Sequence, residues 1–247
     1  MAKKNRTKWV WALLFWVLVW QVCAMVLGNP LLLPGPVQAL ARLWALVTTA
    51  AFWQITWVSI GRILLGVVLG TLLGAALAVA TANSPLLDTL IAPAMTAMQA
   101  TPVASFTILV LIWLDRDFVP VLICLMMVLP VIWNSVSTGI RETDRQLLEM
   151  AEVYRLSPAV RLRRIWIPSV QPFFRSACIS ALGLGWKAGI AAEVLTVPKQ
   201  SIGRMISESK LYLMTEDLFA WTLAVVLLSL LLQKLMLGLL KGRKRHA

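Results

Sequence analysis

The sequence lacks the side chains on which most enzyme sites depend. Its one histidine is His246, in a chain of 247 residues. This excludes from the interior a histidine triad, an H-E-x-x-H zinc site and a histidine proton relay. No Gly-Lys dipeptide and no G-x-S-x-G segment occurs, so the chain has no phosphate-binding P-loop and no serine nucleophile of that type. We therefore expect no catalytic activity, no cofactor and no metal site.

Cysteine is scarce as well. Cys23, Cys124 and Cys178 all lie in apolar stretches, and no two of them form a C-x-x-C pair. This spacing indicates neither a metal site nor a disulfide framework. We expect three buried, small hydrophobic side chains.

Charged residues are also few, at 14% of the chain, whereas 60% of residues are hydrophobic. Residues 9–41, 63–87, 89–114 and 118–140 contain no Asp, Glu, Lys or Arg. A helix needs about 20 apolar residues to cross a hydrocarbon core of roughly 30 Å. Because lipid offers no partners to backbone N–H and C=O groups, such spans must be helical. The sequence predicts an all-α, polytopic membrane protein with a single domain over residues 1–247.

Proline, glycine and short polar turns divide the chain into six expected spans. The third of these is interrupted by Pro93 and Pro102. Residues 37–51 predict a short amphipathic helix near the outer surface. The first apolar run is longer than the core of a cleaved signal peptide, so we expect it to be retained as a span. The six spans cover residues 9–27, 52–81, 86–114, 118–138, 170–195 and 216–240.

The basic residues are unevenly distributed between the two sides that these spans define. Of 23 Lys and Arg, four precede the first span, six lie in residues 141–164 and four follow the last span. Only five fall in the segments assigned to the other side. The positive-inside rule then places both termini and the 141–164 segment in the cytoplasm. This distribution explains the net charge of +12 without nucleic acid as a partner.

Residues 141–168 form the only long polar segment between spans. We expect a helix over Leu147–Tyr154, a bend at Arg155–Leu156, and a second helix with Ser157 as N-cap and Pro158 in its first turn. In that second helix, Val160, Leu162, Ile165 and Trp166 would make apolar contacts while Arg161, Arg163 and Arg164 stay solvated. A basic amphipathic loop of this kind favours a docking surface for a cytoplasmic partner over a simple connection.

A few residues inside the expected spans stand out. Small residues recur every four positions in the second span, at Gly66, Gly70, Gly74 and Ala78, which favours close helix packing within the subunit or, alternatively, between subunits. Charges inside spans are costly and indicate function. Arg62 and Lys187 are the deepest basic residues, and Lys187 either lines a pathway for an anion or pairs with another helix. Lys187 and Glu193 are six residues apart, too far around a helix to pair with each other. Asp115 and Asp117 are expected to be solvated in a turn.

Several motifs resemble those of ABC importer permeases. Glu149-Met150-Ala151, followed by Ser157 and by Ile165-Trp166-Ile167-Pro168, resembles the family's E-A-A loop, although Met150 replaces Ala and Arg155 replaces Gly. Four other segments have the order and spacing of the nitrate, sulfonate and taurine type within this family. They are Ser59 to Arg62, Thr101 to Ala104, Leu129 to Asn134 with Gly139, and Gly183 to Trp186 with Glu193.

The resemblance implies a type I, binding-protein-dependent importer fold in a bacterial inner membrane, with a core over residues 52–240 and a cytoplasmic coupling loop over residues 141–168. It further implies a second permease copy, most simply in a homodimer, a cytoplasmic ATP-binding subunit docked on the loop, and an extracytoplasmic solute-binding protein. Glu149, Ala151, Arg155 and Ser157 are the expected coupling residues.

Arg62 and Lys187 are the candidates for lining the translocation path. One alternative remains from the residues alone, a stand-alone secondary transporter or channel for a small anion. Such a protein would need ionisable residues near the midplane, and only these two qualify.

Overall fold

The computed structural model describes residues 2–241, and over that range it contains helices and no strand. Five of the described helices are long and apolar enough to cross a membrane. The prediction of an all-α polytopic protein is therefore confirmed. The helices that carry these spans are α1 (Ala2–Leu27), α3 (Ala50–Asn83), α6 (Val119–Arg141), α9 (Ile167–Thr196) and α11 (Thr215–Lys241).

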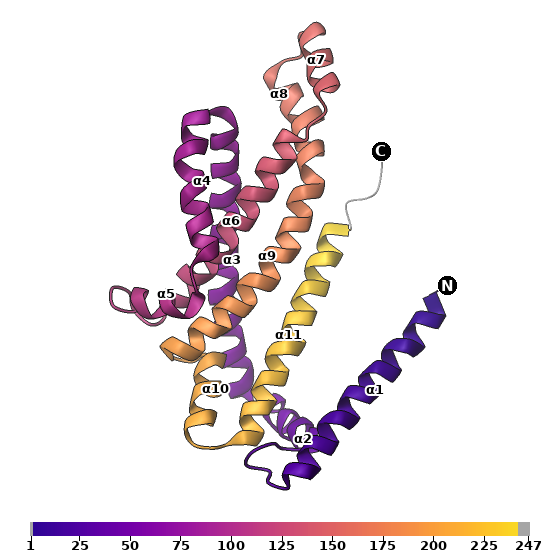
Figure 1. The fold of residues 1–247 in the computed structure, drawn as a ribbon, viewed down its shortest axis with the longest axis vertical. Helices are drawn as coiled ribbons and strands as arrows, with labels where there is room; N and C mark the ends of the chain where they lie inside the picture. The colour runs from indigo at the N-terminus through magenta and orange to yellow at the C-terminus, as the bar shows by residue number, and fades with distance from the viewer. Residues whose placement is uncertain (1, 242–247) are drawn as a thin grey trace.

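The long helices α3, α6 and α9 form a packed bundle, with α11 beside α9 (Figure 1). Helix α1 diverges from this bundle and reaches it through α2 (Pro36–Val47), the expected amphipathic helix. Arg42 on α2 pairs with Asp217 at the start of α11, at 3.1 Å between Nη2 and Oδ2. The bundle has an α7 end, where α7 (Arg145–Val153) projects, and an α10 end, where α10 (Ile202–Leu211) connects α9 to α11.

The expected third span over residues 86–114 is not one helix. It consists of α4 (Pro85–Ala100) and α5 (Val103–Val110), with Thr101 in an extended conformation at ψ 124°. Pro102 explains the break because proline disfavours the helical conformation of the residue before it. The expected interruption at Pro93 is wrong, since α4 continues through it. Together α4 and α5 still lead the chain back from the end of α3 toward the start of α6 (Figure 1).

The small residues of the second span bring two backbones together within the subunit. A Cβ atom added at Gly66, Gly70 or Gly74 would lie 2.4, 2.8 or 2.7 Å from a carbonyl oxygen of α6. These glycines therefore let α3 and α6 approach closely. The prediction of packing within one chain is confirmed, and no side chain larger than hydrogen fits at these positions without a shift.

The second half of the polar segment is continuous with the next span. Helix α8 (Pro158–Arg161) runs through a π-helical turn, η1 (Leu162–Trp166), directly into α9. The expectation of a separate short helix before a span that begins near residue 170 is wrong. The π-helical turn lies just before Pro168 and Pro172, which have no N–H for the helical hydrogen-bond ladder.

The expectation of three buried cysteines is met at two positions only. Cys124 and Cys178 are buried, whereas Cys23 on α1 is exposed. The reason is that the apolar part of α1, Val10–Leu27, packs against almost nothing else in the described chain.

Candidate functional site

The bend between α7 and α8 has the geometry of a Schellman helix end. The Leu156 N–H donates to the Ala151 carbonyl at 2.9 Å, and the Arg155 N–H donates to the Glu152 carbonyl at 2.9 Å. Arg155 lies in the left-handed region at φ 46°, the position that usually holds glycine. The bend expected at Arg155–Leu156 is therefore present, although the residue there carries a side chain.

Arg161 holds this bend closed from the other side. Its Nε donates to the Leu156 carbonyl at 3.0 Å, and its Nη2 donates to the Ala151 carbonyl at 3.3 Å. A basic side chain at the carbonyl end of a helix satisfies orphan acceptors there. The expectation that Arg161 is simply solvated is wrong. These contacts join α7, the bend and α8 into one unit, residues 145–161, which we call the docking module after the docking surface predicted there from the sequence.

The other candidate residues of the module differ in exposure. Glu149 is exposed and lies 3.3 Å from Arg145 on the same helix. Ser157 is the exposed N-cap of α8, but its side chain makes no capping hydrogen bond. Ala151 is fully buried, so its methyl group packs inside the module and is not on its surface. Exposed apolar side chains surround Glu149 on α7. They are Leu147, Met150, Val153 and Tyr154.

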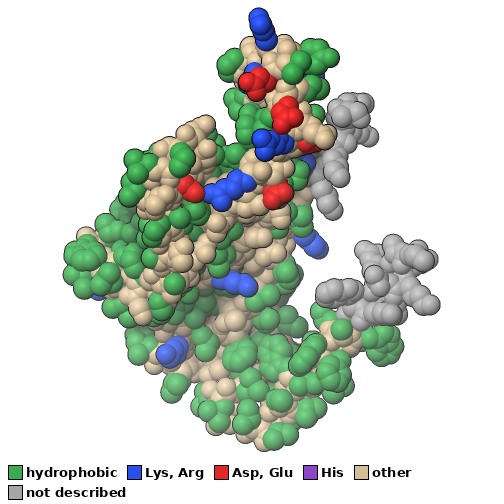
Figure 2. Space-filling view, turned by 45° about the horizontal axis from the view of Figure 1, so that its top comes forward, with side chains coloured by type: hydrophobic (Ala, Val, Ile, Leu, Met, Phe, Trp, Pro, Cys, Tyr) green, Lys and Arg blue, Asp and Glu red, His purple; other side chains and the backbone are tan. Residues whose placement is uncertain are grey.

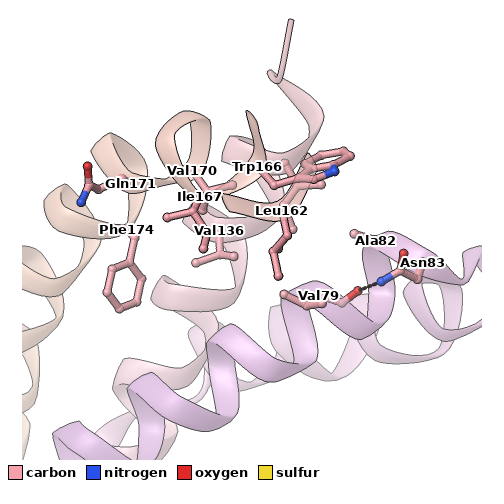
Figure 3. Close-up of a pocket in the computed structure, with 11 residues that line it drawn as sticks. Val79, Ala82, Asn83, Val136, Leu162, Trp166, Ile167, Val170, Gln171 and Phe174 are labelled. Atoms are coloured by element: carbon pink, nitrogen blue, oxygen red, sulfur yellow. Dashed lines mark hydrogen bonds between the residues drawn. The ribbon is translucent and has the colours of Figure 1, made fainter. Parts of the chain in front are cut away.

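An apolar cavity of about 460 Å³ lies beneath the docking module, at the α7 end of the bundle. Figure 3 shows Leu162, Trp166 and Ile167 on one side and Val79, Ala82 and Asn83 of α3 on another. The remaining lining residues come from α6 and α9. They are Val136, Ile140, Val170, Gln171 and Phe174.

Lys187 is exposed on α9 and forms no ion pair within the described residues. It belongs to a stripe of exposed side chains that follows α9 along its length. No other element of the described chain covers this stripe, so it is open to a lipid, a second copy or a transported molecule. The stripe consists of Ser176, Ser180, Leu184, Lys187, Ala191 and Leu195.

Arg62 is tied into a cluster at the α10 end. Its Nη2 donates to Oδ1 of Asp117 at 2.7 Å and to the Lys199 carbonyl at 2.9 Å. Its Nη1 lies 3.6 Å from Oε1 of Glu193. Asp117 was expected to be solvated and is instead the partner of Arg62. A charge inside a span needs a counter-charge, and this rule could have suggested the pairing between α3 and α9 from the sequence.

The charges of the molecule are concentrated at the α7 end in the view of Figure 2. Acidic and basic side chains gather toward that end, whereas hydrophobic side chains, uncharged polar groups with backbone, and a few separate basic side chains make up the rest of that face. The apolar surface is that of a protein embedded in lipid, and the charged end that of a part in contact with water.

Comparison with known proteins gives a consistent result. A model of the family described as "Binding-protein-dependent transport system inner membrane component" matches residues 66–242, more than half of the chain. The taurine transport system permease protein TauC of Escherichia coli is 25% identical over 221 residues, covering 87% of this chain and 80% of TauC. The putative aliphatic sulfonates transport permease protein SsuC of Bacillus subtilis is 25% identical, with 83% and 74% covered. The nitrate import permease protein NrtB of Synechococcus elongatus is 26% identical, with 72% and 67% covered.

Proposed function

The chain belongs to the family of binding-protein-dependent transport system inner membrane components, the permease subunits of ABC importers, and we propose how it works within such an importer. The family membership confirms the resemblance drawn from the sequence motifs. In our proposal a cytoplasmic ATP-binding subunit docks on the docking module, residues 145–161. The chain itself hydrolyses nothing and contributes the path across the membrane.

The main support for this proposal is the continuity of the helix from Pro158 to Thr196. The module is part of the same rod as the fifth membrane span, because α8, η1 and α9 follow one another without a loop. A partner that moves the module therefore also moves α9. A flexible connection at this point would lose that movement.

The side chains on the surface of the docking module are those of a protein-binding surface and not of one that contacts only water. Val153 is 79% exposed and Tyr154 is 73% exposed, at the end of a helix whose other exposed side chains include Arg145 and Glu149. Exposed apolar groups next to charged ones mark interaction sites on soluble surfaces. Glu149, Arg155 and Ser157 are exposed alongside them, and Ala151 supports the contact from within by packing.

The sides of the membrane follow from the basic residues. We place the docking module and both termini in the cytoplasm, since the two termini and residues 141–164, which contain the module, carry 14 of the 23 lysines and arginines. In this orientation the α10 end faces the outside, where a solute-binding protein would deliver its ligand.

We further propose that the exposed stripe of α9 lines the translocation path between this chain and a second copy in a homodimer. Lys187 lies within the stripe and is free to attract an anion. Arg62 also remains a candidate for the path, but Asp117 and Glu193 offset its charge, so in our proposal it shapes the path and does not attract the substrate.

The decisive experiment pairs two charge reversals on either side of the start of α7. Glu149→Lys alters the proposed docking surface, and Glu142→Lys changes the same kind of exposed side chain at the end of α6. We expect Glu149→Lys to lower the amount of ATPase that co-purifies with the chain and to abolish ATP-driven uptake, and Glu142→Lys to have a much smaller effect. Normal uptake by Glu149→Lys would contradict docking at this site.

Transport by the purified parent chain tests the alternative of a stand-alone secondary transporter or channel for a small anion. Purified chain in vesicles, with no ATPase present, should move none of the probes taurine, an alkanesulfonate or nitrate. Uptake of any of these under a proton or sodium gradient alone would favour the alternative.

A further inference from the structure

The side chain of Glu193 is fully buried on α9 and links three helices. Its Oε2 accepts a hydrogen bond from the Ser59 hydroxyl of α3 at 2.8 Å and another from the Gly203 N–H of α10 at 3.1 Å. Its Oε1 makes no hydrogen bond to the described residues and faces Nη1 of Arg62. The positive end of the α10 dipole also favours a carboxylate at this position.

The neighbours of Glu193 extend these contacts. The Ser59 Oγ, while donating to Glu193, accepts from the Ile202 N–H at 2.9 Å. Asp117 accepts from the Lys199 N–H at 3.1 Å in addition to Arg62. The N–H groups of Ile202 and Gly203 at the start of α10, which have no partner within their own helix, are thus satisfied by side chains of α3 and α9. We call Ser59, Arg62, Asp117, Glu193 and Gly203 the polar joint.

The polar joint has no room for a side chain at position 203. A Cβ atom at residue 203 would lie 2.3 Å from Cβ of Glu193 and 2.4 Å from the backbone nitrogen of Val194. Helix α10 therefore lies directly against the backbone of α9. Opening the joint would leave a buried carboxyl group and several backbone N–H groups without partners, which low-polarity surroundings strongly disfavour.

The opposite, α7 end of the bundle differs from the polar joint in the side chains that lie between its helices. At the α7 end, where Gly139 of α6 lies against Phe173 of α9, an apolar cavity of about 460 Å³ separates α3 from η1 and the first turns of α9. Its walls are mainly apolar side chains that can slide without losing hydrogen bonds, and the π-helical turn η1 forms part of one wall. Within the described residues no hydrogen bond or ion pair joins η1 or α9 to α3 at this end, and the Trp133 Nε1–Thr81 Oγ1 hydrogen bond of 3.1 Å there lies between α6 and α3. Movement of α9 away from α3 at this end therefore breaks no polar contact.

We propose that Glu193 is a positioning residue of the transport cycle. Through the polar joint it keeps the α10 ends of α3, α9 and α10 together as one block, so that movement of the docking module opens and closes the bundle at the apolar cavity. This inference rests on the proposed function, because it takes the docked ATPase as the source of the movement. The role of Glu193 is separate from docking and from contact with the substrate.

Two cysteine pairs test the proposal in the complex of this chain with its ATPase, in a Cys23→Ser background. Arg116→Cys with Lys199→Cys spans the outer surface beside the polar joint, and both residues line one cavity there. The joint uses only the backbone of Lys199, so these substitutions leave it intact. Ala82→Cys with Ile167→Cys spans the apolar cavity. The rate of crosslinking by a bismaleimide is measured with and without ATP and vanadate.

We expect the rate for the 82/167 pair to change severalfold on trapping, and the rate for the 116/199 pair to stay constant. Adding Glu193→Ala should make the 116/199 rate depend on nucleotide, while Glu193→Gln, which keeps an acceptor oxygen, should restore constancy at least in part. A nucleotide-dependent 116/199 rate in the parent chain would overturn the inference, as would an unchanged 82/167 rate. If no ATPase co-purifies with the parent chain, it is the proposed function that fails.

Discussion

Replacing Gly203 with alanine should destabilise this protein far more than the same change at Gly61, where a Cβ atom meets nothing within 4 Å. The added Cβ would meet Glu193 Cβ at 2.3 Å, so α10 must move away from α9 by about an ångström or more before the contact is an ordinary one. Overpacking of this kind costs about 1–3 kcal/mol. The displacement also lengthens the hydrogen bond from the Gly203 N–H to Glu193, whose net contribution is about 1 kcal/mol or more.

Thermal unfolding of the purified chain, followed by tryptophan fluorescence, measures this effect. A change of 1 kcal/mol shifts the midpoint by roughly 2–4 °C in a chain of this size, so Gly203→Ala, at about 2–4 kcal/mol in all, should lower it by roughly 4–16 °C. The matched control is Gly61→Ala, because a Cβ there meets nothing within 4 Å. That change should leave the midpoint unaltered or raise it, since alanine favours a helix over glycine by about 1 kcal/mol. Equal midpoints for the two variants would refute the close packing of α10 on α9.

Two further predictions concern the docking module and the exposed stripe of α9. Arg155→Gly should stabilise the bend by about 1 kcal/mol, because glycine takes the left-handed conformation without strain. We expect ATPase binding equal to or stronger than that of the parent, and weaker binding in a titration would argue against the bend as the docking geometry. Lys187→Gln should lower uptake of an anionic probe about tenfold or more, since a hydrogen bond to a charged group contributes about 1.5–3 kcal/mol. Lys187→Arg should retain uptake, and ATPase co-purification should not change in either variant.

The long helices were predictable because their signal is local. An apolar run without charges needs no knowledge of its neighbours to be assigned as a span. The break at Pro102 follows from local chemistry too, and so does the N-cap position of Ser157. The continuity of α8 with α9 was not predictable in this way, since Pro168 and Pro172 indicate a helix start in the sequence. The structure accommodates them after a π-helical turn.

The polar joint could be predicted only in part. Arg62 and Glu193 are 131 positions apart in the sequence, and each is an unusual charge inside a span, so a pairing between helices was open to inference. The contribution of Gly203 was not, because its N–H reaches Glu193 only through the turn between α9 and α10. Arg155 shows the limit of motif comparison. The motif indicates a glycine, and only the backbone reveals that an arginine takes the same conformation.

The close contacts at two glycines of α9 indicate which part of the bundle can move. A Cβ at Gly189 would lie 2.6 Å from Sγ of Cys124 on α6 and 2.7 Å from Cγ1 of Ile63 on α3, and one at Gly185 would lie 2.7 Å from a methyl group of Val67. The three helices are therefore in close contact along the part of α9 nearest the polar joint. Toward the α7 end α6 stays close to α9 at Gly139 and Phe173, but α3 is separated from α9 by a cavity lined by side chains such as Phe174 and Val170. Since close-packed interiors resist deformation, the free end of the α8–α9 rod is the part that can follow a docked partner.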